Sequence, residues 1–334
     1  MKSYIKIPVK ISREFIALTK HYSLFYAFYN VLWWLCFYVR TPLSWRLSSW
    51  ALKKKTHWLD AHIEKEYADI IRRYQGRQED TQAVENPRIW VFWGQGEAAM
   101  PPLIRACYQQ LCRHHDNVTL VTNDNVRQFL DLSPVIYEKV ETGKITWAHF
   151  SDIVRTSLLA QYGGLWLDAT VWVPAKLPME RLKQYKVFSA NGKVDVTSRS
   201  ICFWTSLGVN WSTWCMFTSA KNNLMFSFVS EMLQSIAEKS KVWPDYVIQD
   251  YLIYYAFRFL PEVGEQLQQV ATWSCAKRNF LATIMNQEFK RAEYDELCSS
   301  DYFFKLSFRS AWKTQTQDGK MTYYGYVTGP ITKV

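Results

Sequence analysis

Glycine and proline are scarce in this sequence, with 12 glycines and 11 prolines among 334 residues. It also has no visible internal repeat and no low-complexity tract. Hydrophobic residues make up 49% of the chain, which excludes a disordered protein. The composition therefore predicts a globular protein with a sizeable core, built as one large domain or two.

The motifs of several protein classes are missing as well. No Walker loop and no G-x-G-x-x-G pattern is present, which argues against a P-loop NTPase and a dinucleotide-binding enzyme. No zinc-finger spacing, basic heptad region or aromatic-basic RNA signature occurs either. Although the net charge is +10, we therefore expect no nucleic-acid partner.

Cysteine and histidine offer little for catalysis. The seven cysteines contain no C-x-x-C pair, which predicts reduced, structural thiols in a cytoplasmic protein. Only His149 lies near the candidate site described below, and no nucleophile elbow accompanies it, so a hydrolase with a catalytic triad is not indicated. A glycosidase would need two opposed carboxylates, an arrangement that the pattern below does not suggest.

Aromatic residues and positive charge, by contrast, are abundant. The chain has 16 tryptophans and 20 tyrosines, whose flat apolar faces and polar edges suit sugars, nucleobases and membrane interfaces. The basic balance indicates anionic partners such as phosphates or anionic lipids.

The first 85 residues differ in character from the rest. Residues 22–39, YSLFYAFYNVLWWLCFYV, form an aromatic-rich apolar run between basic segments. The run is shorter than the roughly 20 residues of a spanning helix, Asn30 interrupts it, and no signal cleavage site is present. Two interpretations stay open: a helix lying in a membrane interface, and a helix packed on the protein's own core. Residues 56–76 predict an amphipathic helix that ends at a glycine.

Short apolar strands and helices alternate from residue 88 onward. Residues 88–96 predict a buried strand that enters a glycine turn, and residues 118–124 predict a second strand. This alternation is typical of a parallel α/β sheet that binds ligands at the carboxyl ends of its strands. We therefore expect two regions. Residues 1–85 form a helical region that could associate with a membrane, and residues 86–334 form an α/β domain.

The most informative stretch is residues 148–178, AHFSDIVRTSLLAQYGGLWLDATVWVPAKLP. It predicts a helix that begins near Ser151 and stops at Gly163 and Gly164. The segment LWLD then reads as a central strand with Asp168 at its carboxyl end. A carboxylate at this end of a strand lies where an α/β sheet holds its ligands.

Three charged residues of this stretch form a candidate site. Asp152 and Arg155 are three residues apart and share one face of the predicted helix. Asp168 could hold a divalent cation that bridges a diphosphate, and the other two could bind phosphate or sugar hydroxyls. The alternative is purely structural: Asp152 pairs with Arg155, and Asp168 caps a turn.

Three segments resemble the bacterial capsular polysaccharide synthesis glycosyltransferases: FWGQGEAAMPPLIRACYQQL, HFSDIVRTSLLAQYGGLWLDATVWV and the late FFKLSF with YYGY. That group is similar to enzymes with the DXD sugar-binding region, including α-mannosyltransferases and, more distantly, the glucosylating toxins. The resemblance runs from about residue 88 to 326 and leaves the first 85 residues outside. It implies a GT-A-type, nucleotide-sugar-binding α/β sandwich with added N-terminal helices. It further implies transfer of a sugar from a nucleotide-sugar donor to a polysaccharide or lipid-linked saccharide acceptor, with retention of configuration.

The resemblance also implies roles for individual residues. Asp152 and Arg155 match the pair that contacts the donor sugar, and Gly164 belongs to the same donor-binding pattern. Asp168 matches the first carboxylate of the DXD signature, beside the sugar and the metal-diphosphate. Trp93 matches an aromatic position that packs on the nucleobase in the toxins, and an ordinary core tryptophan is the alternative.

The signature departs from its usual form at the second carboxylate, where this chain has Thr170. A hydroxyl is a weak, neutral ligand, so we expect weak or partial dependence on Mn²⁺ or Mg²⁺. Either Asp168 holds the ion with another group, or basic residues neutralise the diphosphate instead.

Two later residues complete the candidates. Asp250, inside a predicted helix, is a catalytic candidate beside the reacting sugar, with an exposed helix acid as the alternative. Lys305 is a candidate for contact with the departing diphosphate, with a surface lysine as the alternative.

The sequence thus predicts a cytoplasmic transferase, which is peripheral on the inner face of the cell membrane under the first of the two interpretations of residues 22–39. Thr170 leaves a second function open, that of a catalytically weak sugar-nucleotide-binding or scaffold subunit of a capsule assembly complex.

Overall fold

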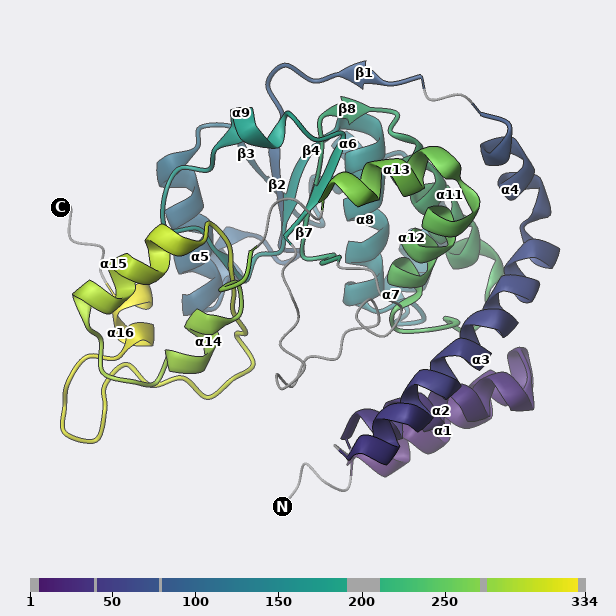
Figure 1. Ribbon diagram of the computed structural model, residues 1–334, viewed down its shortest axis with the longest axis horizontal. Helices are drawn as coiled ribbons and strands as arrows, with labels where there is room; N and C mark the ends of the chain where they lie inside the picture. The colour runs from purple at the N-terminus through teal and green to yellow at the C-terminus, as the bar shows by residue number, and fades with distance from the viewer. Residues whose placement is uncertain (1–5, 39–40, 78–79, 191–210, 271–274, 330–334) are drawn as a thin grey trace.

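A computed structural model describes residues 6–38, 41–77, 80–190, 211–270 and 275–329 of the protein (Figure 1). At its centre is a five-stranded sheet with the strand order β3-β2-β4-β7-β6. The strands are β2 (Ile89–Phe92), β3 (Val118–Val121), β4 (Gly164–Leu167), β6 (Val187–Ser189) and β7 (Cys215–Thr218). The predicted α/β class is confirmed, and β3 and β4 run parallel to β2 as expected.

The other two strands correct the expectation of a purely parallel sheet. β7 pairs antiparallel with β4, and β6 pairs antiparallel with β7. The prediction used the alternation of strands and helices. This alternation indicates that two strands are parallel only where a helix between them returns the chain to the same end of the sheet. That alternation stops after β4, because the short strand β5 (Val171–Trp172) follows almost directly. The sheet is therefore mixed.

Side chains that alternate along the strands enter two separate cores. Trp90 and Trp166 are buried on the sheet face covered by three helices, whereas Ile89 and Leu165 are buried on the opposite face. The three helices of the first face are α8 (Trp147–Tyr162), α11 (Leu224–Lys239) and α12 (Ile248–Phe259). The opposite face is covered by α5 (Pro102–His114).

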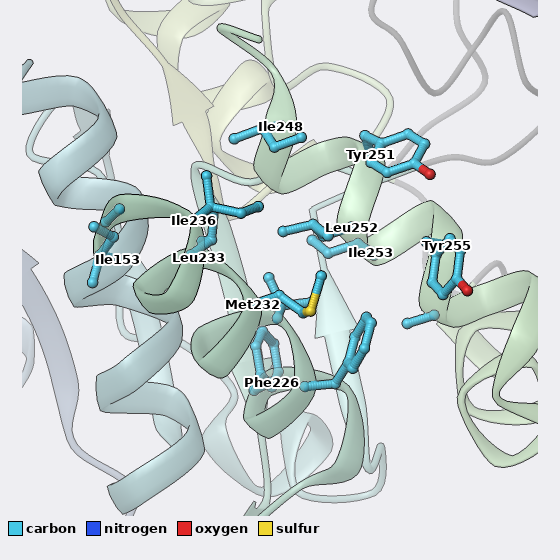
Figure 2. Close-up of a cluster of buried hydrophobic side chains, with 14 of the residues drawn as sticks. Ile153, Phe226, Met232, Leu233, Ile236, Ile248, Tyr251, Leu252, Ile253 and Tyr255 are labelled. Carbon is cyan, nitrogen blue, oxygen red and sulfur yellow. The ribbon is translucent and has the colours of Figure 1, made fainter. Parts of the chain in front are cut away.

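Figure 2 shows the packing within the first core. Ile153 of α8, Leu233 of α11 and Leu252 of α12 are fully buried and belong to one hydrophobic cluster. The short elements around these layers are η1 (Glu97–Ala99), α6 (Val126–Phe129), α7 (Pro134–Glu141), α9 (Met179–Leu182) and α13 (Pro261–Val270).

The C-terminal part lies beside the sheet and returns to it (Figure 1). It contains α14 (Phe280–Ile284), α15 (Arg291–Ser300), β9 (Phe304–Lys305) and α16 (Tyr323–Thr328). β9 pairs antiparallel with β5, with Lys305 opposite Val171. This pairing brings a late segment of the chain next to the residues that follow β4.

The N-terminal region is helical, as predicted. It consists of α1 (Lys6–His21), α2 (Leu24–Tyr38), α3 (Pro42–Glu66), α4 (Ala68–Gln75) and β1 (Gln82–Ala83), which pairs antiparallel with β8 (Ala220–Lys221). The helix expected over 56–76 is the end of α3 together with α4, interrupted at Tyr67, whose φ of −126° is not helical. α3 begins earlier than expected because Thr41 and Ser44 form a capping box in front of it.

The apolar run of residues 22–39 corresponds to α2, and its last residue lies outside the described part. Tyr26, Ala27, Asn30 and Trp33 are buried, whereas Phe28 and other residues of α2 are exposed. α2 therefore packs on the protein with one face and exposes the other. The buried face fits a helix packed on the protein's own core, and the exposed apolar face fits a helix in a membrane interface. Among the described residues, no helix combines the length and the hydrophobicity needed to cross a bilayer.

Candidate active site

A cleft of about 790 Å³ opens beyond the carboxyl ends of β2 and β4. It is lined by the first turns of α8, by the residues that follow β2 and β4, by the segment 246–250, and by 305–309. Segments far apart in the sequence thus converge at the strand ends, where the sequence predicted a ligand site.

Asp168 lies at the carboxyl end of β4 and points its carboxylate into this cleft. Oδ1 accepts a hydrogen bond from Nε1 of Trp166 at 3.0 Å and lies 3.6 Å from Nη2 of Arg155. Oδ2 lies 2.7 Å from Nζ of Lys305. Burial alone would raise the pKa of Asp168, but the charges of Lys305 and Arg155 outweigh burial and lower this pKa to about 2. Asp168 is therefore ionised at neutral pH.

Lys305 connects Asp168 to Thr170. Its Nζ also donates a hydrogen bond to Oγ1 of Thr170 at 2.6 Å. The pairing of β9 with β5 fixes this contact, since Lys305 lies opposite Val171, the residue after Thr170. A lysine ammonium therefore lies beside both Asp168 and Thr170, so Lys305 is not an isolated surface lysine.

Asp152 and Arg155 lie on one face of α8, as predicted. α8 begins at Trp147, one turn before the expected Ser151, because Thr146 caps it. Nη2 of Arg155 lies 3.2 Å from Oδ1 of Asp152, and Nη1 donates to the carbonyl oxygen of Thr213 at 2.9 Å. The ion pair of Asp152 with Arg155, which the structural alternative required, is thus present, and it lies inside the cleft together with Asp168.

The two acids of this group have opposite pKa shifts. Burial raises the pKa of Asp152 to about 7; Arg155 opposes this shift, and Asp250 and Asp168 add to it. Asp152 therefore exchanges a proton near neutral pH, whereas Asp168 stays charged. Environments that separate the pKa values of neighbouring carboxylates are typical of sites with distinct acid-base and electrostatic roles.

Asp250 and Trp93 also line the cleft. Asp250 is in the first turn of α12, close enough to Asp152 to raise its pKa. Trp93 meets Phe308 edge-to-face, with ring centroids 5.6 Å apart. Nε1 of Trp93 is buried without a hydrogen-bond partner among the described residues. Trp93 also packs against the core on the α5 side of the sheet, so it belongs to the core and to the cleft at once.

Gly164 is not brought to the cleft. It begins β4, whereas Asp168 follows the other end of this strand, about 13 Å away at the usual rise per residue. Its φ is +98°, and a Cβ at this position would lie 2.4 Å from the carbonyl oxygen of Arg88. The glycine is therefore required for the close approach of β4 to the chain before β2.

Several cleft residues carried no recognisable signal in the sequence. Trp147, Tyr246 and Phe308 line the cleft and are 45%, 54% and 39% exposed to solvent. Trp214 and Arg309 line it as well. Nothing distinguishes these aromatic residues from the many others of the chain until the fold brings them together.

The wall of the cleft around Tyr246 is held from behind by the N-terminal helices. The hydroxyl of Tyr26 donates to the carbonyl oxygen of Pro244 at 2.8 Å. Nζ of Lys55 lies 2.5 Å from Oδ2 of Asp245 and donates to Oδ1 of Asn30 at 2.9 Å. The side chains of Lys55 and Asp245 are completely buried.

Lys55→Met is expected to lower the free energy of unfolding by roughly 3–5 kcal/mol, because it leaves the carboxylate of Asp245 buried without its partner. The double variant Lys55→Met/Asp245→Leu removes both charges and should be considerably more stable than the single variant. Urea denaturation measures both values. Lys53→Met, an exposed position of the same helix, is the control. A loss in Lys55→Met no larger than in this control would contradict the structural role of the pair.

The site does not offer a set of ligands that fits a tightly bound divalent cation. Among the described residues, no group of three or more His, Cys, Asp or Glu side chains is close enough to hold a metal ion. Asp168 already has the cations Lys305 and Arg155 on its two oxygens. A metal ion at Asp168 would have to displace the ammonium of Lys305 and compete with the guanidinium of Arg155.

Fold and site together define a class: an α/β protein whose strand-end cleft combines half-buried carboxylates, fixed cations and exposed aromatic rings. Such a cleft suits an anionic ligand that carries hydroxyl groups. The chain belongs to the capsular polysaccharide synthesis protein family, whose family model matches residues 43–327. The protein thus has a role in capsular polysaccharide synthesis. A comparison with curated proteins finds no match.

The family match corrects one expectation. It begins at residue 43, near the start of α3, whereas the resemblance in the sequence was expected to leave the first 85 residues outside. α3 and α4 contain no recognisable motif, but α3 carries Lys55, which holds the segment next to the cleft.

Proposed function

We propose that the protein is a GT-A-type glycosyltransferase that moves a sugar from a nucleotide-sugar donor to a saccharide or lipid-linked saccharide acceptor in capsule synthesis. The observation that carries this proposal is the position of Asp168, at a strand end, between the cations Arg155 and Lys305. The cleft in front of it, about 790 Å³, falls within the range of small-molecule sites, about 300–1,000 Å³.

The cations are the groups we assign to the donor diphosphate. Arg155 offers a planar fork of donors, Lys305 a point charge, and Arg309 lines the same cleft. When the bond between the anomeric carbon and the diphosphate breaks, negative charge grows on the leaving oxygen. Fixed positive groups stabilise that state more than the ground state, and this difference accelerates the reaction.

The carboxylates are the groups we assign to the sugars. Asp152 accepts hydrogen bonds from donor hydroxyls when ionised and donates one when protonated, since its pKa is about 7. The acceptor hydroxyl forms the new bond to the anomeric carbon and loses its proton, and we assign Asp250 to take that proton. Retention of configuration is part of the proposal because the family resemblance implies it, and it requires the acceptor hydroxyl to attack on the same face of the sugar from which the diphosphate leaves.

We place this activity in the cytoplasm. The reason is the spacing of the cysteines, which predicts reduced thiols.

Metal dependence is expected to be weak, because Lys305 supplies positive charge beside Asp168. Thr170→Asp restores the second carboxylate of the signature and should tighten Mn²⁺ binding in calorimetry. Thr170→Ser keeps the hydroxyl and serves as the control, with Mn²⁺ binding like that of the wild type. Tight Mn²⁺ binding by the wild type, with all activity lost on chelation, would contradict this part of the proposal.

Trp93 is proposed to stack on the nucleobase. Stacking on an aromatic side chain is worth roughly 1–3 kcal/mol, so Trp93→Ala should raise the donor Kd about fivefold to a hundredfold. The same loss is expected with the free nucleoside diphosphate, because the sugar does not contact Trp93. Trp93→Phe keeps an aromatic face and should retain most of the affinity. A folded Trp93→Ala protein that binds nucleotides like the wild type would rule out stacking.

A scaffold subunit that binds but does not turn over sugar nucleotides is the second candidate, favoured by the departure at Thr170. A thermal-shift screen of nucleotide sugars identifies the base and sugar that the cleft prefers. Turnover of the preferred compound then separates the two functions: an enzyme releases the nucleoside diphosphate, and a scaffold does not. Stabilisation by no nucleotide sugar would contradict both.

A further inference from the structure

The hairpin of α2 and α3 carries a group of exposed apolar side chains. Helical spacing places exposed residues on one face of α2 and one face of α3. We define this hairpin face as Leu24, Phe25, Phe28, Leu35, Leu43, Leu47 and Trp50, which expose between 40% and 68% of their surface. Tyr29 connects the two helices within it, because its ring lies 5.7 Å from Phe28 and 5.4 Å from Trp50.

Single exposed hydrophobic residues are ordinary, but a contiguous group usually marks an interaction site. Fifteen large hydrophobic side chains are exposed in the described part of the chain, and seven of them form the hairpin face. Three of the others, Trp147, Tyr246 and Phe308, line the cleft. Figure 1 shows α1, α2 and the first part of α3 at one corner of the molecule, away from the central sheet. The hairpin face is therefore accessible to a large, flat partner.

The charges around the hairpin identify the kind of partner. Arg13, Arg46, Lys53 and Lys54 are exposed on α1 and α3, whereas Glu14 is the only acidic residue between positions 11 and 57. Glu14 is half-buried and accepts a hydrogen bond from the buried Asn30, so its carboxylate is turned toward the protein. Apolar and aromatic residues fringed by positive charge are complementary to the interface of an anionic bilayer. A purely apolar protein partner would not require this basic fringe.

The inner side of the same hairpin packs against the segment that forms one wall of the cleft. Tyr26 and Lys55 fix Pro244 and Asp245, and the ring of Trp34 meets that of Tyr246 with centroids 6.3 Å apart. A surface bound by the outer side is therefore separated from the cleft wall by the hairpin alone.

We propose that the hairpin face binds the interface of an anionic phospholipid bilayer, with α2 and the first half of α3 lying on it without crossing it. The cleft then opens next to the membrane surface, where a lipid-linked saccharide is presented. This last step rests on the proposed function, whereas membrane binding itself does not.

Cosedimentation of the full chain with vesicles tests the proposal. We expect binding to vesicles of phosphatidylcholine with phosphatidylglycerol, and at least about a hundredfold weaker partitioning for Phe28→Ser/Leu47→Ser/Trp50→Ser, which loses three apolar side chains. Phe280→Ser is the matched control: Phe280 is 44% exposed but lies on α14, and its loss should leave binding unchanged.

A charge variant tests the choice of lipid. Arg46→Glu/Lys53→Glu/Lys54→Glu should lose binding to the anionic vesicles, since each basic residue near such a surface contributes about fivefold. Binding of the wild type to pure phosphatidylcholine should be weak. Because these three side chains are exposed, this variant decides the question if the apolar variant does not fold.

Three results would overturn the proposal. The first is a wild type that fails to sediment with anionic vesicles, and the second is a set of variants that sediment as well as the wild type does. The third is a wild-type dimer in light scattering that becomes a monomer in the apolar variant without any vesicle binding, which would make the hairpin face an interface between copies. Nucleotide-sugar turnover in the absence of vesicles is measured separately, so failure of the proposed function is distinguished from failure of membrane binding.

Discussion

Asp168→Asn is expected to lower the rate of sugar transfer by roughly 10³-fold, the upper range for loss of a single preorganised electrostatic group. The substitution keeps the size of the side chain and an oxygen that can accept the hydrogen bond from Trp166. It removes the charge that orients Lys305 and Arg155. Because this part of the cleft is partly exposed to solvent, we expect little change in thermal stability.

The affinity for free nucleoside diphosphate separates an electrostatic role from a metal-binding role of Asp168. If Lys305 and Arg155 hold the diphosphate directly, Asp168→Asn removes a repelling charge, and the Kd should stay the same or fall. If a metal bridges Asp168 and the diphosphate, the Kd should rise instead. Asp124→Asn is the matched control, since Asp124 also follows a strand of the sheet but does not line the cleft. Wild-type transfer by Asp168→Asn would exclude the proposed site.

Lys305→Met is expected to lower kcat/KM for the donor roughly 10²-fold, with part of the loss in the affinity for nucleoside diphosphate. The reason is that the substitution removes a cation that pairs with Asp168 and is proposed to contact the diphosphate. Without Lys305 the pKa of Asp168 rises from about 2, since Lys305 is the larger of the two charges that lower it.

Mn²⁺ should stimulate Lys305→Met more than the wild type, because a divalent cation can then occupy the position of the ammonium. Kinetics with and without chelator measure this difference. Lys277→Met, at an exposed lysine outside the cleft, should behave like the wild type in both respects. Equal kinetics of Lys305→Met and the wild type would show that Lys305 does not act on the donor.

The strand-end aspartate was predictable from the sequence because its position depends only on local order. The helix that stops at Gly163, the short strand and Asp168 follow one another within a few residues. The helical spacing of Asp152 and Arg155 likewise placed both on one face of α8. Their joint position in the cleft followed from the rule that parallel strands bind ligands at their carboxyl ends.

The contact between Lys305 and Asp168 was harder to predict from the sequence, since the two residues are 137 positions apart. It depends on the pairing of β5 with β9, two strands of two residues each, which leave hardly any periodic signal. The antiparallel direction of β7 escaped prediction for a similar reason, because the sequence before it contains no pattern that indicates how the chain returns to the sheet. The resemblance suggested Lys305, but only the fold shows its two partners.

In the N-terminal helices, the composition could be interpreted from the sequence but the buried face could not. The apolar, aromatic-rich composition of residues 22–39 was evident, but which side chains face the protein depends on distant partners. Tyr26 and Lys55 are buried because Pro244 and Asp245 lie against them. The hydrophobic residues on the outer side of α3 were missed because basic residues are interspersed among them.

Release of nucleoside diphosphate from a panel of nucleotide sugars, by the purified full chain, tests the central claim most directly. The claim is that the cleft of Asp168, Arg155 and Lys305 binds a nucleotide sugar and breaks its bond to the sugar. We expect slow release from one compound of the panel, faster release when saccharide acceptors are added, and loss of both in Asp168→Asn. Tight binding of a nucleotide sugar without any release, with or without acceptor, would contradict the claim and identify the protein as a binding subunit.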